Sequence, residues 1–354
     1  YCAEENKKII LTGTDSLGIR FALNRGLFDR AHVIHTTYIP FKEHHHLLGI
    51  KDVDTYIQYG GTLTNGKVFY QDDSDYTNSA IAANIQHSLE QLDDGGAFGP
   101  LMKFYAADEL MTFIQKIIEQ ANRTFLAKTV NRMFKSHALS KLQKNLLRKS
   151  SVDIDLSGLE RSELNDLLQK ELMIKDPLLN KATPESIQTA KDYLKALDVI
   201  YIVPGTDEEE IIFIQPGLRY GQVQKLMDRL KQTPLLKQYS PSERKLFCEI
   251  LDTTVKGEIM KDILYYQLSR DSDLKKTYEV IKCQDMLRAH EFDLVLCNAE
   301  NDEAFLLDVK HSKEYLPNVQ VRHLLDKDAC RAAEDAMHVK EKGKAVIYRG
   351  KRKA

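Results

Sequence analysis

The clearest periodicity lies near the C-terminal end, where apolar and polar residues alternate as they do in paired β-strands. In HEFDLVLCNAENDEAFLLDVKHS (residues 290–312), two apolar stretches flank a polar loop. We expect the loop to span residues 298–303 and the hairpin to close on Cys297 and Ala304. Because side chains of a strand alternate between faces with a period of two, this register fixes which residues share a face.

An antiparallel hairpin in this register places Asp293 opposite Asp308 and Glu291 opposite Lys310, with all four on one face. A slip by one residue would separate the two pairs. The alternating apolar residues are expected to face a core on the other side. They are Phe292, Leu294, Leu296, Phe305, Leu307 and Val309.

The N-terminal part of the chain reads as mixed α/β structure. Short strands are predicted over residues 9–12 and 32–38, and helices over 86–92 and 107–122. Three adjacent histidines, His44 to His46, fall at a predicted helix start. Because adjacent residues of a helix point in different directions, we expect these three on the surface and not around a metal.

Residues 153–220 have the pattern of a small winged helix. Thr183-Pro184 is a favourable helix start, with Thr as the cap and Pro at the first helical position. Two strand-like runs, VIYIV and IIFIQ, then surround the loop PGTDEEE. Because four carboxylates in that loop would repel a phosphate backbone, a protein-contact role is favoured over DNA recognition.

The remaining residues, from about 241, predict a last α/β unit. A helix over residues 242–268 precedes the hairpin, and a helix over 322–338 and a strand over 345–348 follow it. The predicted domains are 1–125, 126–235 and 236–354. The expected fold class is therefore α/β multidomain.

Composition constrains the class of protein further. The chain has 354 residues, 43% of them apolar, and a formal net charge of -2, so nucleic-acid affinity would require a local patch. No run of 18 apolar residues predicts a membrane span. The five cysteines are widely spaced without a CxxC pair, which predicts a reducing, cytoplasmic location. The chain begins with Tyr1 close to a predicted strand, so we expect a preceding segment.

Residues 121–152 contain eight Lys or Arg residues and no acidic residue. A solvated helical face is the plainer interpretation. A phosphate-binding surface for nucleic acid is the sharper one. A separate motif, GTLTNGKV at residues 61–68, matches GxxxxGK but ends in Val68, whereas a phosphate loop needs Ser or Thr there to bind magnesium. We interpret it as a chance match, so ATPase activity of this chain alone is not predicted.

Acidic residues inside a half-buried hairpin indicate chemistry. Two or three clustered carboxylates are costly unless a cation compensates them. Mg²⁺ or Mn²⁺ suits such oxygen ligands and would activate water for phosphodiester cleavage. Lys310 would neutralise developing charge, and Glu258 on the preceding helix would supply a further ligand or a base. An ordinary hairpin with one solvated face is the alternative.

At this point the chain resembles a known group. EFDLVLC…FLLDVKHS is similar to the PD-(D/E)xK nuclease-like core, which takes an Asp on one strand and acid-x-Lys on the next. The resemblance implies Asp293, Asp308 and Lys310 as catalytic residues, with Glu258 in VKGEIMKDIL as the helix acid and Gln320 in NVQVRHL as a polar residue. Asp293, Asp308 and Glu258 would hold the metal.

The broader resemblance is to prokaryotic AAA-type ATPases that carry a winged helix and this nuclease-like tail. TGTDSLGIRF resembles their sensor 1 segment, and RAHVIHTTYIPFKEHHHLLG, YIQYGGTL and IQPGLRY resemble further landmarks. It implies residual nucleotide sensing by Thr14, Ser16 and Arg30, although Asp29 replaces the Gly that the family prefers there.

The nucleotide-binding loop and the acidic magnesium strand of these ATPases are absent, and the family layout places them before Tyr1. ATP is therefore expected as a cofactor only with such a preceding part. Two functions follow: a Mg²⁺- or Mn²⁺-dependent nuclease acting on nucleic acid, or a regulatory ATP-binding protein whose nuclease-like domain is a platform for a partner protein or nucleic acid.

Overall fold

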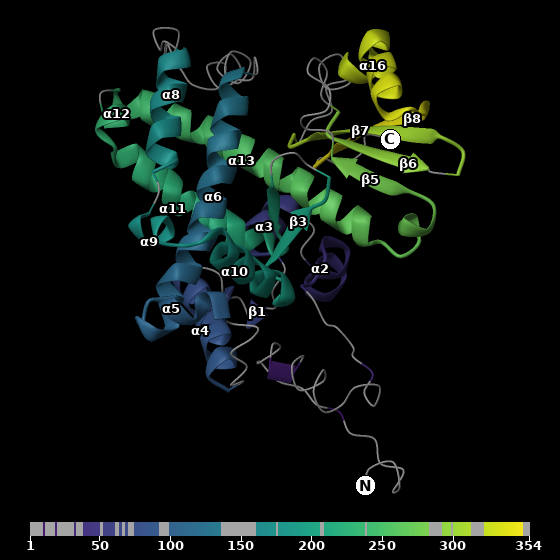
Figure 1. Cartoon of the computed structure of the whole chain (residues 1–354). Helices are drawn as coiled ribbons and strands as arrows, with labels where there is room; N and C mark the ends of the chain where they lie inside the picture. The colour runs from purple at the N-terminus through teal and green to yellow at the C-terminus, as the bar shows by residue number, and fades with distance from the viewer. Residues whose placement is uncertain are drawn as a thin grey trace, which may run out of the picture. The chain divides into compact units, whose positions relative to one another are not determined.

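The computed structural model contains helices and strands in mixed α/β arrangement (Figure 1). It describes residues 10, 18–19, 32, 38–49, 52–60, 64–65, 68–69, 74–91, 99–135, 161–174, 176–205, 209–237, 239–282, 292–298, 300–312 and 322–349. The chain divides into two compact units, each assembled from separate segments: residues 1–37, 73–120 and 175–211, and residues 38–72, 121–174 and 212–354. No helix of the described ranges is both long and apolar enough to cross a bilayer.

The first unit is mainly helical. Its elements are α4 (Ser74–Gln91), η2 (Gly99–Leu101), α5 (Met102–Ala106), the first part of α6 (Leu110–Lys135), α9 (Pro177–Asn180), α10 (Pro184–Ala196) and β3 (Ile200–Val203). The predicted start of α10 is confirmed, because the Thr183 side chain accepts the Ser186 N–H at 3.1 Å. The rings of Phe104 and Phe113 stack with centroids 3.9 Å apart in the core.

Several sequence-based element boundaries were wrong in extent. The helix predicted over residues 86–92 is the end of the longer α4, and the one predicted over 107–122 runs over 110–135 as α6. The two strands predicted after α10 are present as β3 and β4 (Glu210–Phe213), which form a two-stranded sheet. Residues 64–65 and 68–69 pair as the antiparallel strands β1 and β2, so Val68, where a phosphate loop would continue into a helix, lies in a strand.

The second unit surrounds one long helix. Besides the second part of α6, its described helices are α2 (Phe41–Leu48), α3 (Val53–Tyr59), α8 (Arg161–Leu172), α11 (Pro216–Gln232), α12 (Pro234–Lys237), the long α13 (Pro241–Arg270), η3 (Leu274–Lys276), α15 (Arg322–Leu325) and α16 (Lys327–Met337). The 30-residue α13 begins at a capping box, in which Ser240 and Glu243 satisfy each other's backbone N–H groups. Helix α13 contacts α11, α3 and the four-stranded sheet.

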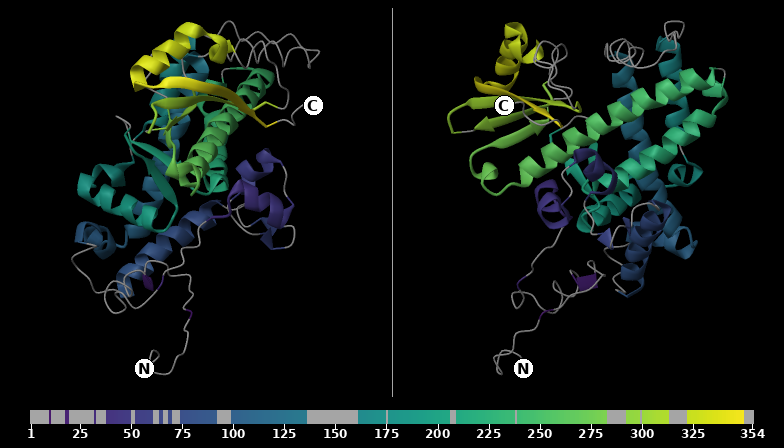
Figure 2. Two further views of the ribbon diagram at one scale, coloured as in Figure 1. Left: turned by 90° about the vertical axis from the view of Figure 1, so that its right-hand side faces the viewer. Right: turned by 180° about the vertical axis from the view of Figure 1, so that it is seen from behind.

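That sheet has the order β5 (Glu279–Lys282), β6 (Leu294–Asn298), β7 (Glu303–Lys310) and β8 (Lys340–Tyr348). Strands β5, β6 and β7 are antiparallel, whereas β8 runs parallel to β7 after a helical crossover. Cys297 pairs with Ala304 and Leu294 with Leu307, which confirms the predicted hairpin register. Helix α13 lies on one face of the sheet and α16 on the other (Figure 2).

The sheet face that carries Asp308 is a second core and not the half-solvated face that the alternation predicted, whereas Asp293, which precedes β6, contacts Lys261 of α13. Val295 and Leu306 on this face are at most 1% exposed and pack against Ala329 and Ala333 of α16. Phe292, which was expected on the opposite side, belongs to this same cluster. The expectation was wrong because covering both faces of a sheet depends on helices that lie far along the sequence.

The single helix expected over residues 322–338 is divided. Asp326 lies between α15 and α16, and its side chain accepts the N–H groups of Asp328 and Ala329. Asp competes with the helix for backbone hydrogen bonds and is a favourable N-cap, which explains why one helix ends and the next begins there.

His44 contradicts the expected surface position of the histidine run. His46 is exposed, whereas His44 is 0% exposed and meets the Tyr56 ring at 5.1 Å between centroids. Neither ring nitrogen of His44 has a hydrogen-bond partner, and burial lowers its pKa. The helix places the first of the three adjacent histidines inward because Phe41, three residues earlier on the same face, also contacts Tyr56.

We expect His44→Phe to stabilise the chain by about 1 kcal/mol, because a buried polar group without a partner is costly. A histidine with a lowered folded-state pKa favours the unfolded, protonated chain below its unfolded pKa of about 6.5. Wild-type thermal stability should therefore decline from pH 7.5 to 5.5 more steeply than that of His44→Phe. His46→Phe is the exposed control. Identical pH profiles for His44→Phe and wild type would contradict the assignment.

Candidate functional site

Three carboxylates from separate elements meet in the second unit. Glu258 lies in the middle of α13, Asp293 immediately precedes β6, and Asp308 lies in β7. They are 7%, 5% and 0% exposed, respectively. Because the pairs 294–307 and 297–304 set the register, Asp293 and Asp308 are neighbours across the hairpin. Buried acids at this density must be compensated by protons, cations or hydrogen-bond donors.

Asp293 is held by the strand and by the helix. Its Oδ2 accepts the Val309 N–H at 2.7 Å, and its Oδ1 is 2.7 Å from Lys261 Nζ. Lys310 Nζ lies 3.9 Å from Oδ2. Burial acts to raise the pKa of Asp293, but the positive charges of Lys261 and Lys310 outweigh it and hold the pKa well below its usual range.

Asp308 has the opposite electrostatic character. Its Oδ1 is 2.5 Å from Lys310 Nζ, whereas its Oδ2 is buried without a hydrogen-bond donor. Burial, followed by the hydrogen bond with the Asp293 carboxyl, raises the pKa of Asp308 to about 7. Two carboxylates this close favour one shared proton in the absence of another cation. Oδ2 of Asp308 is thus an acceptor that a proton or a metal ion would satisfy.

Glu258 is bound by two cations. Arg132 of α6 places Nη1 2.5 Å from its Oε2, and Lys261, one turn along α13, places Nζ 3.0 Å from its Oε1. Burial raises the pKa of Glu258, but Lys261 and Arg132 together lower it below its usual range. The reciprocal effect raises the pKa of Lys261 despite its burial. Both groups are therefore ionised at neutral pH.

The structure brings together four of the residues that the sequence indicated: Glu258, Asp293, Asp308 and Lys310. Lys310 is 34% exposed on its side chain, so it lies at the solvent-facing side of the cluster. The other candidates, Gln320, Thr14, Ser16 and Arg30, and the hairpin residue Glu291, lie outside the described residues.

Two participants were not found from the sequence. Lys261 had a local signal, because it lies three residues after Glu258 on a helix and such residues are neighbours on the helix surface. Arg132 had no local signal for this contact, since 126 residues separate it from Glu258. It belongs to the basic segment 121–152, of which residues 121–135 are described as part of α6.

The carboxylate oxygens of this cluster fit a Mg²⁺ or Mn²⁺ ion that keeps several of its waters. They do not form an enclosed site that would supply every ligand of the metal. Within the described residues, no group of three or more Asp, Glu, His or Cys side chains is arranged to hold a metal. Mg²⁺ commonly uses one or two carboxylates, retains several waters and takes further oxygens from a substrate phosphate. Asp293 and the buried Oδ2 of Asp308 match that requirement, whereas Glu258 is committed to Arg132 and Lys261.

A neighbouring cluster fixes the end of β7. His311, which follows Lys310, places Nε2 2.5 Å from Oδ1 of Asp54 in α3, and Arg349 Nη1 is 3.1 Å from the same His311 atom. Arg349 also forms an ion pair with Asp54. Because these residues come from α3 and from the end of β8, they constrain the backbone that carries Lys310.

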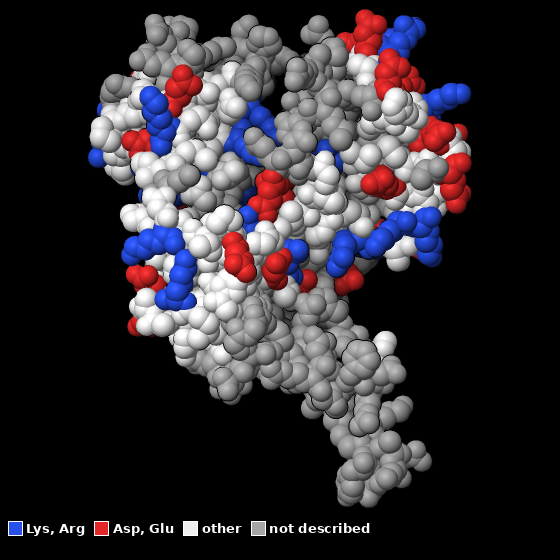
Figure 3. Space-filling view, in the orientation of Figure 1, with Lys and Arg blue, Asp and Glu red and all other residues white. Residues whose placement is uncertain are grey.

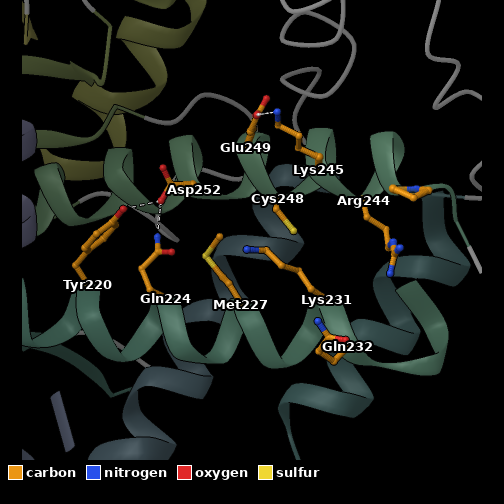
Figure 4. Close-up of a pocket in the computed structure, with 11 residues that line it drawn as sticks. Tyr220, Gln224, Met227, Lys231, Gln232, Arg244, Lys245, Cys248, Glu249 and Asp252 are labelled. Carbon is orange, nitrogen blue, oxygen red and sulfur yellow. Dashed lines mark hydrogen bonds and ion pairs between the residues drawn. The ribbon is translucent and has the colours of Figure 1, made fainter. Parts of the chain in front are cut away.

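A cleft of about 570 Å³ lies between α11 and α13 (Figure 4). At one end, Asp252 accepts hydrogen bonds from the Tyr220 hydroxyl at 2.9 Å and the Gln224 amide at 2.5 Å, and pairs with Lys256 at 2.7 Å. Burial and Asp252 raise the pKa of Tyr220 to about 12. Asp252 thereby joins α11 to α13, which is a structural role.

In the view of Figure 3, Lys and Arg are interspersed with Asp and Glu over the described atoms, and no large basic face is visible. Arg132, counted in the basic segment, is directed to Glu258. Glu209 of the predicted wing pairs with Lys191 of α10. These contacts favour a local function for individual cations over a uniform phosphate-binding surface in the described part of the chain.

Comparison of the chain with protein-family models, curated proteins and solved structures found no match. The arrangement of Asp293, Asp308 and Lys310 therefore supports a function only through its own geometry and chemistry.

Proposed function

We propose that the C-terminal α/β unit is a nuclease-like domain that binds Mg²⁺ or Mn²⁺ and cleaves a phosphodiester bond of nucleic acid. The observation that carries this proposal is the juxtaposition of Asp293 with Asp308, whose buried Oδ2 has no donor, beside the partly exposed Lys310. The pairing of Asp on one strand with Asp-x-Lys on the next also supports the resemblance to the PD-(D/E)xK core.

The roles of the chain's own groups follow from their exposure and charge. Asp293 and Asp308 would hold the divalent cation, which would polarise the phosphate and lower the pKa of a bound water. Lys310 is bound to Asp308 and reaches solvent, so its ammonium would donate to a phosphate oxygen and offset the charge that develops in cleavage. Val309 N–H and Lys261 fix the orientation of Asp293.

The decisive experiment is nicking of supercoiled DNA and cleavage of single-stranded RNA in the presence of Mn²⁺ or Mg²⁺. Asp308→Asn should reduce the rate by about 100-fold or more, because loss of metal stabilisation amounts to several kcal/mol. Asn has the shape of the protonated acid that Asp308 favours, so the variant should keep its fold. Thermal unfolding of the variant checks that point.

Asp302→Asn provides the matched control, since it makes the same chemical change in the exposed hairpin loop. Asp302 has a φ of 51°, which Asn tolerates well. This control should cleave at the wild-type rate. Equal cleavage by wild type and Asp308→Asn, purified in parallel, would exclude the proposed site.

A non-catalytic platform for nucleic acid or a partner protein is the second candidate. It is favoured by one observation: the three carboxylates already face three cations, namely Arg132, Lys261 and Lys310. Such a network of ion pairs compensates the buried carboxylates without a metal ion. The platform predicts binding without cleavage in any divalent metal, and binding that persists in Asp308→Asn.

The association with an AAA-type ATPase remains part of the proposal on the sequence resemblance alone. Thr14, Ser16 and Arg30 would contribute to nucleotide sensing within a longer protein that supplies the phosphate loop. In that arrangement, nucleotide turnover would control access of nucleic acid or a partner protein to the nuclease-like domain.

A further inference from the structure

Lys261 occupies the space between two of the three acids. Its Nζ is 2.7 Å from Asp293 Oδ1 and 3.0 Å from Glu258 Oε1, and its side chain is 17% exposed. The two acids come from different elements, the start of β6 and the middle of α13. A positive charge bound to both carboxylates lies where a metal ion shared by them would lie.

We infer that Lys261 is an internal counter-cation that competes with the divalent metal for Asp293 and offsets the negative charge of Asp293 and Glu258 in the metal-free site. This inference rests on the proposed metal-binding function. When the metal binds Asp293 and Asp308, the Lys261 ammonium leaves Oδ1 of Asp293 and remains on Oε1 of Glu258. Glu258 is consequently the holding group for Lys261 and is not a ligand of the bound metal.

The contacts of Glu258 support this assignment. Arg132 binds the other oxygen, Oε2, at 2.5 Å, so both Glu258 oxygens already have cationic partners. Asp293 also keeps a second partner, the Val309 N–H, after Lys261 leaves. Displacement therefore strands neither Lys261 nor Asp293 without a partner, which is the main cost of opening a buried ion pair.

Charge balance identifies the ligand that favours loading. Glu258, Asp293 and Asp308 carry three negative charges when ionised, and Arg132, Lys261 and Lys310 carry three positive charges. A divalent cation brings an excess of positive charge to this buried site. The phosphodiester of a nucleic acid would reduce that excess, so metal and anionic substrate should bind cooperatively.

Calorimetric titration of Mn²⁺ into wild type, Lys261→Met and Lys261→Arg tests the inference. Met retains the length of the side chain and removes the charge, so no ammonium competes for Oδ1 of Asp293 and Lys261→Met should bind Mn²⁺ about tenfold or more tightly than wild type. Lys261→Arg keeps the competitor and should bind no more tightly than wild type. Lys245→Met is the control on the same helix. The Lys245 side chain is 78% exposed, and its Nζ lies 4.0 Å from Glu249 Oε1, which is the geometry of a weak surface ion pair.

Thermal unfolding with and without Mn²⁺ gives a second, independent measurement. Lys261→Met should be less stable than wild type without metal and should gain more from Mn²⁺ than wild type gains. If Lys261→Met does not fold without Mn²⁺, the measurement uses Lys261→Gln, which keeps a hydrogen-bond donor for one carboxylate. An Mn²⁺ affinity of the folded Met or Gln variant at or below the wild-type value would overturn the inference.

The two proposals fail in different ways. Nicking by wild type together with unchanged Mn²⁺ affinity in the Lys261 variants would reject the counter-cation and retain the nuclease. Tighter Mn²⁺ binding by Lys261→Met without cleavage by wild type would retain the counter-cation and leave a metal-binding platform. Absence of Mn²⁺ binding in wild type and in both neutral variants would reject the counter-cation together with the metal site.

Discussion

Replacing Asp293 with alanine should destabilise the second unit by about 3–5 kcal/mol, the usual loss when one partner of a buried ion pair is removed. The variant leaves Lys261 with Glu258 alone and removes the acceptor of the Val309 N–H. Because the chain has more than one compact unit, hydrogen exchange of the β6 and β7 amides is the appropriate measurement, supported by thermal unfolding.

Asp273→Ala is the matched control for this loss. Asp273 pairs with Lys276 at 2.8 Å, but both side chains are more than 70% exposed, so its removal should change stability by no more than about 0.5 kcal/mol. Equal protection of the sheet amides in Asp293→Ala and Asp273→Ala would show that the Asp293 contacts do not stabilise the unit.

Asp308→Asn should behave differently from Asp293→Ala in the same measurement. The raised pKa of Asp308 means that stability is lost as pH rises from its unfolded value, about 4, through its folded value of about 7. Asn carries no ionisable proton and can donate to Asp293, so the variant should equal or exceed wild type in stability at pH 8. The ionised Asp293 carboxylate is thus expected to stabilise the fold, whereas ionisation of Asp308 is expected to destabilise it.

Replacing Arg219 with alanine should cost about 3–5 kcal/mol, similar to truncation of a large core residue. Arg219 is 1% exposed, and its guanidinium carbon lies 4.2 Å from the centroid of the Phe125 ring and 4.7 Å from that of Phe213. Desolvated cation–π contacts of this kind add to the lost packing. Thermal unfolding and exchange of the α11 amides would measure the effect.

Two substitutions separate packing from stacking at this position. Arg219→Lys retains the charge but loses the planar group that stacks on aromatic rings, so it should also destabilise, although less than alanine. Arg229→Ala, at an exposed position of the same helix, should have little effect. A stability of Arg219→Ala close to that of Arg229→Ala would contradict the proposed role of the stacked guanidinium.

The hairpin and its register were predictable because both depend on short-range features. A polar loop and alternating residues sufficed to pair Cys297 with Ala304 and to place Asp293 beside Asp308. Lys261 was within reach of the same reasoning, because the i, i+3 spacing from Glu258 on α13 is local information.

Contacts between distant segments were not predictable in this way. The Arg132 interaction with Glu258 spans 126 residues, and its formation depends on how α6 and α13 pack. The cover of the acid-bearing sheet face by α16 likewise has no local signal in the hairpin. His44 was misplaced for the same reason, since its inward position follows from the contact of α2 with Tyr56.

Strand β8 completes the environment of Asp308 without supplying a ligand or a base. It pairs with β7 in parallel and sets Val346 beside Asp308, so β7 is an interior strand with neighbours on both sides. Without β8, β7 would become an edge strand whose free backbone groups invite pairing with another chain. A truncation that removes β8 but keeps every acidic residue of the cluster would therefore still expose the backbone around Asp308 to water. The pairing of β8 with β7 is thus a precondition for any chemistry at Asp308.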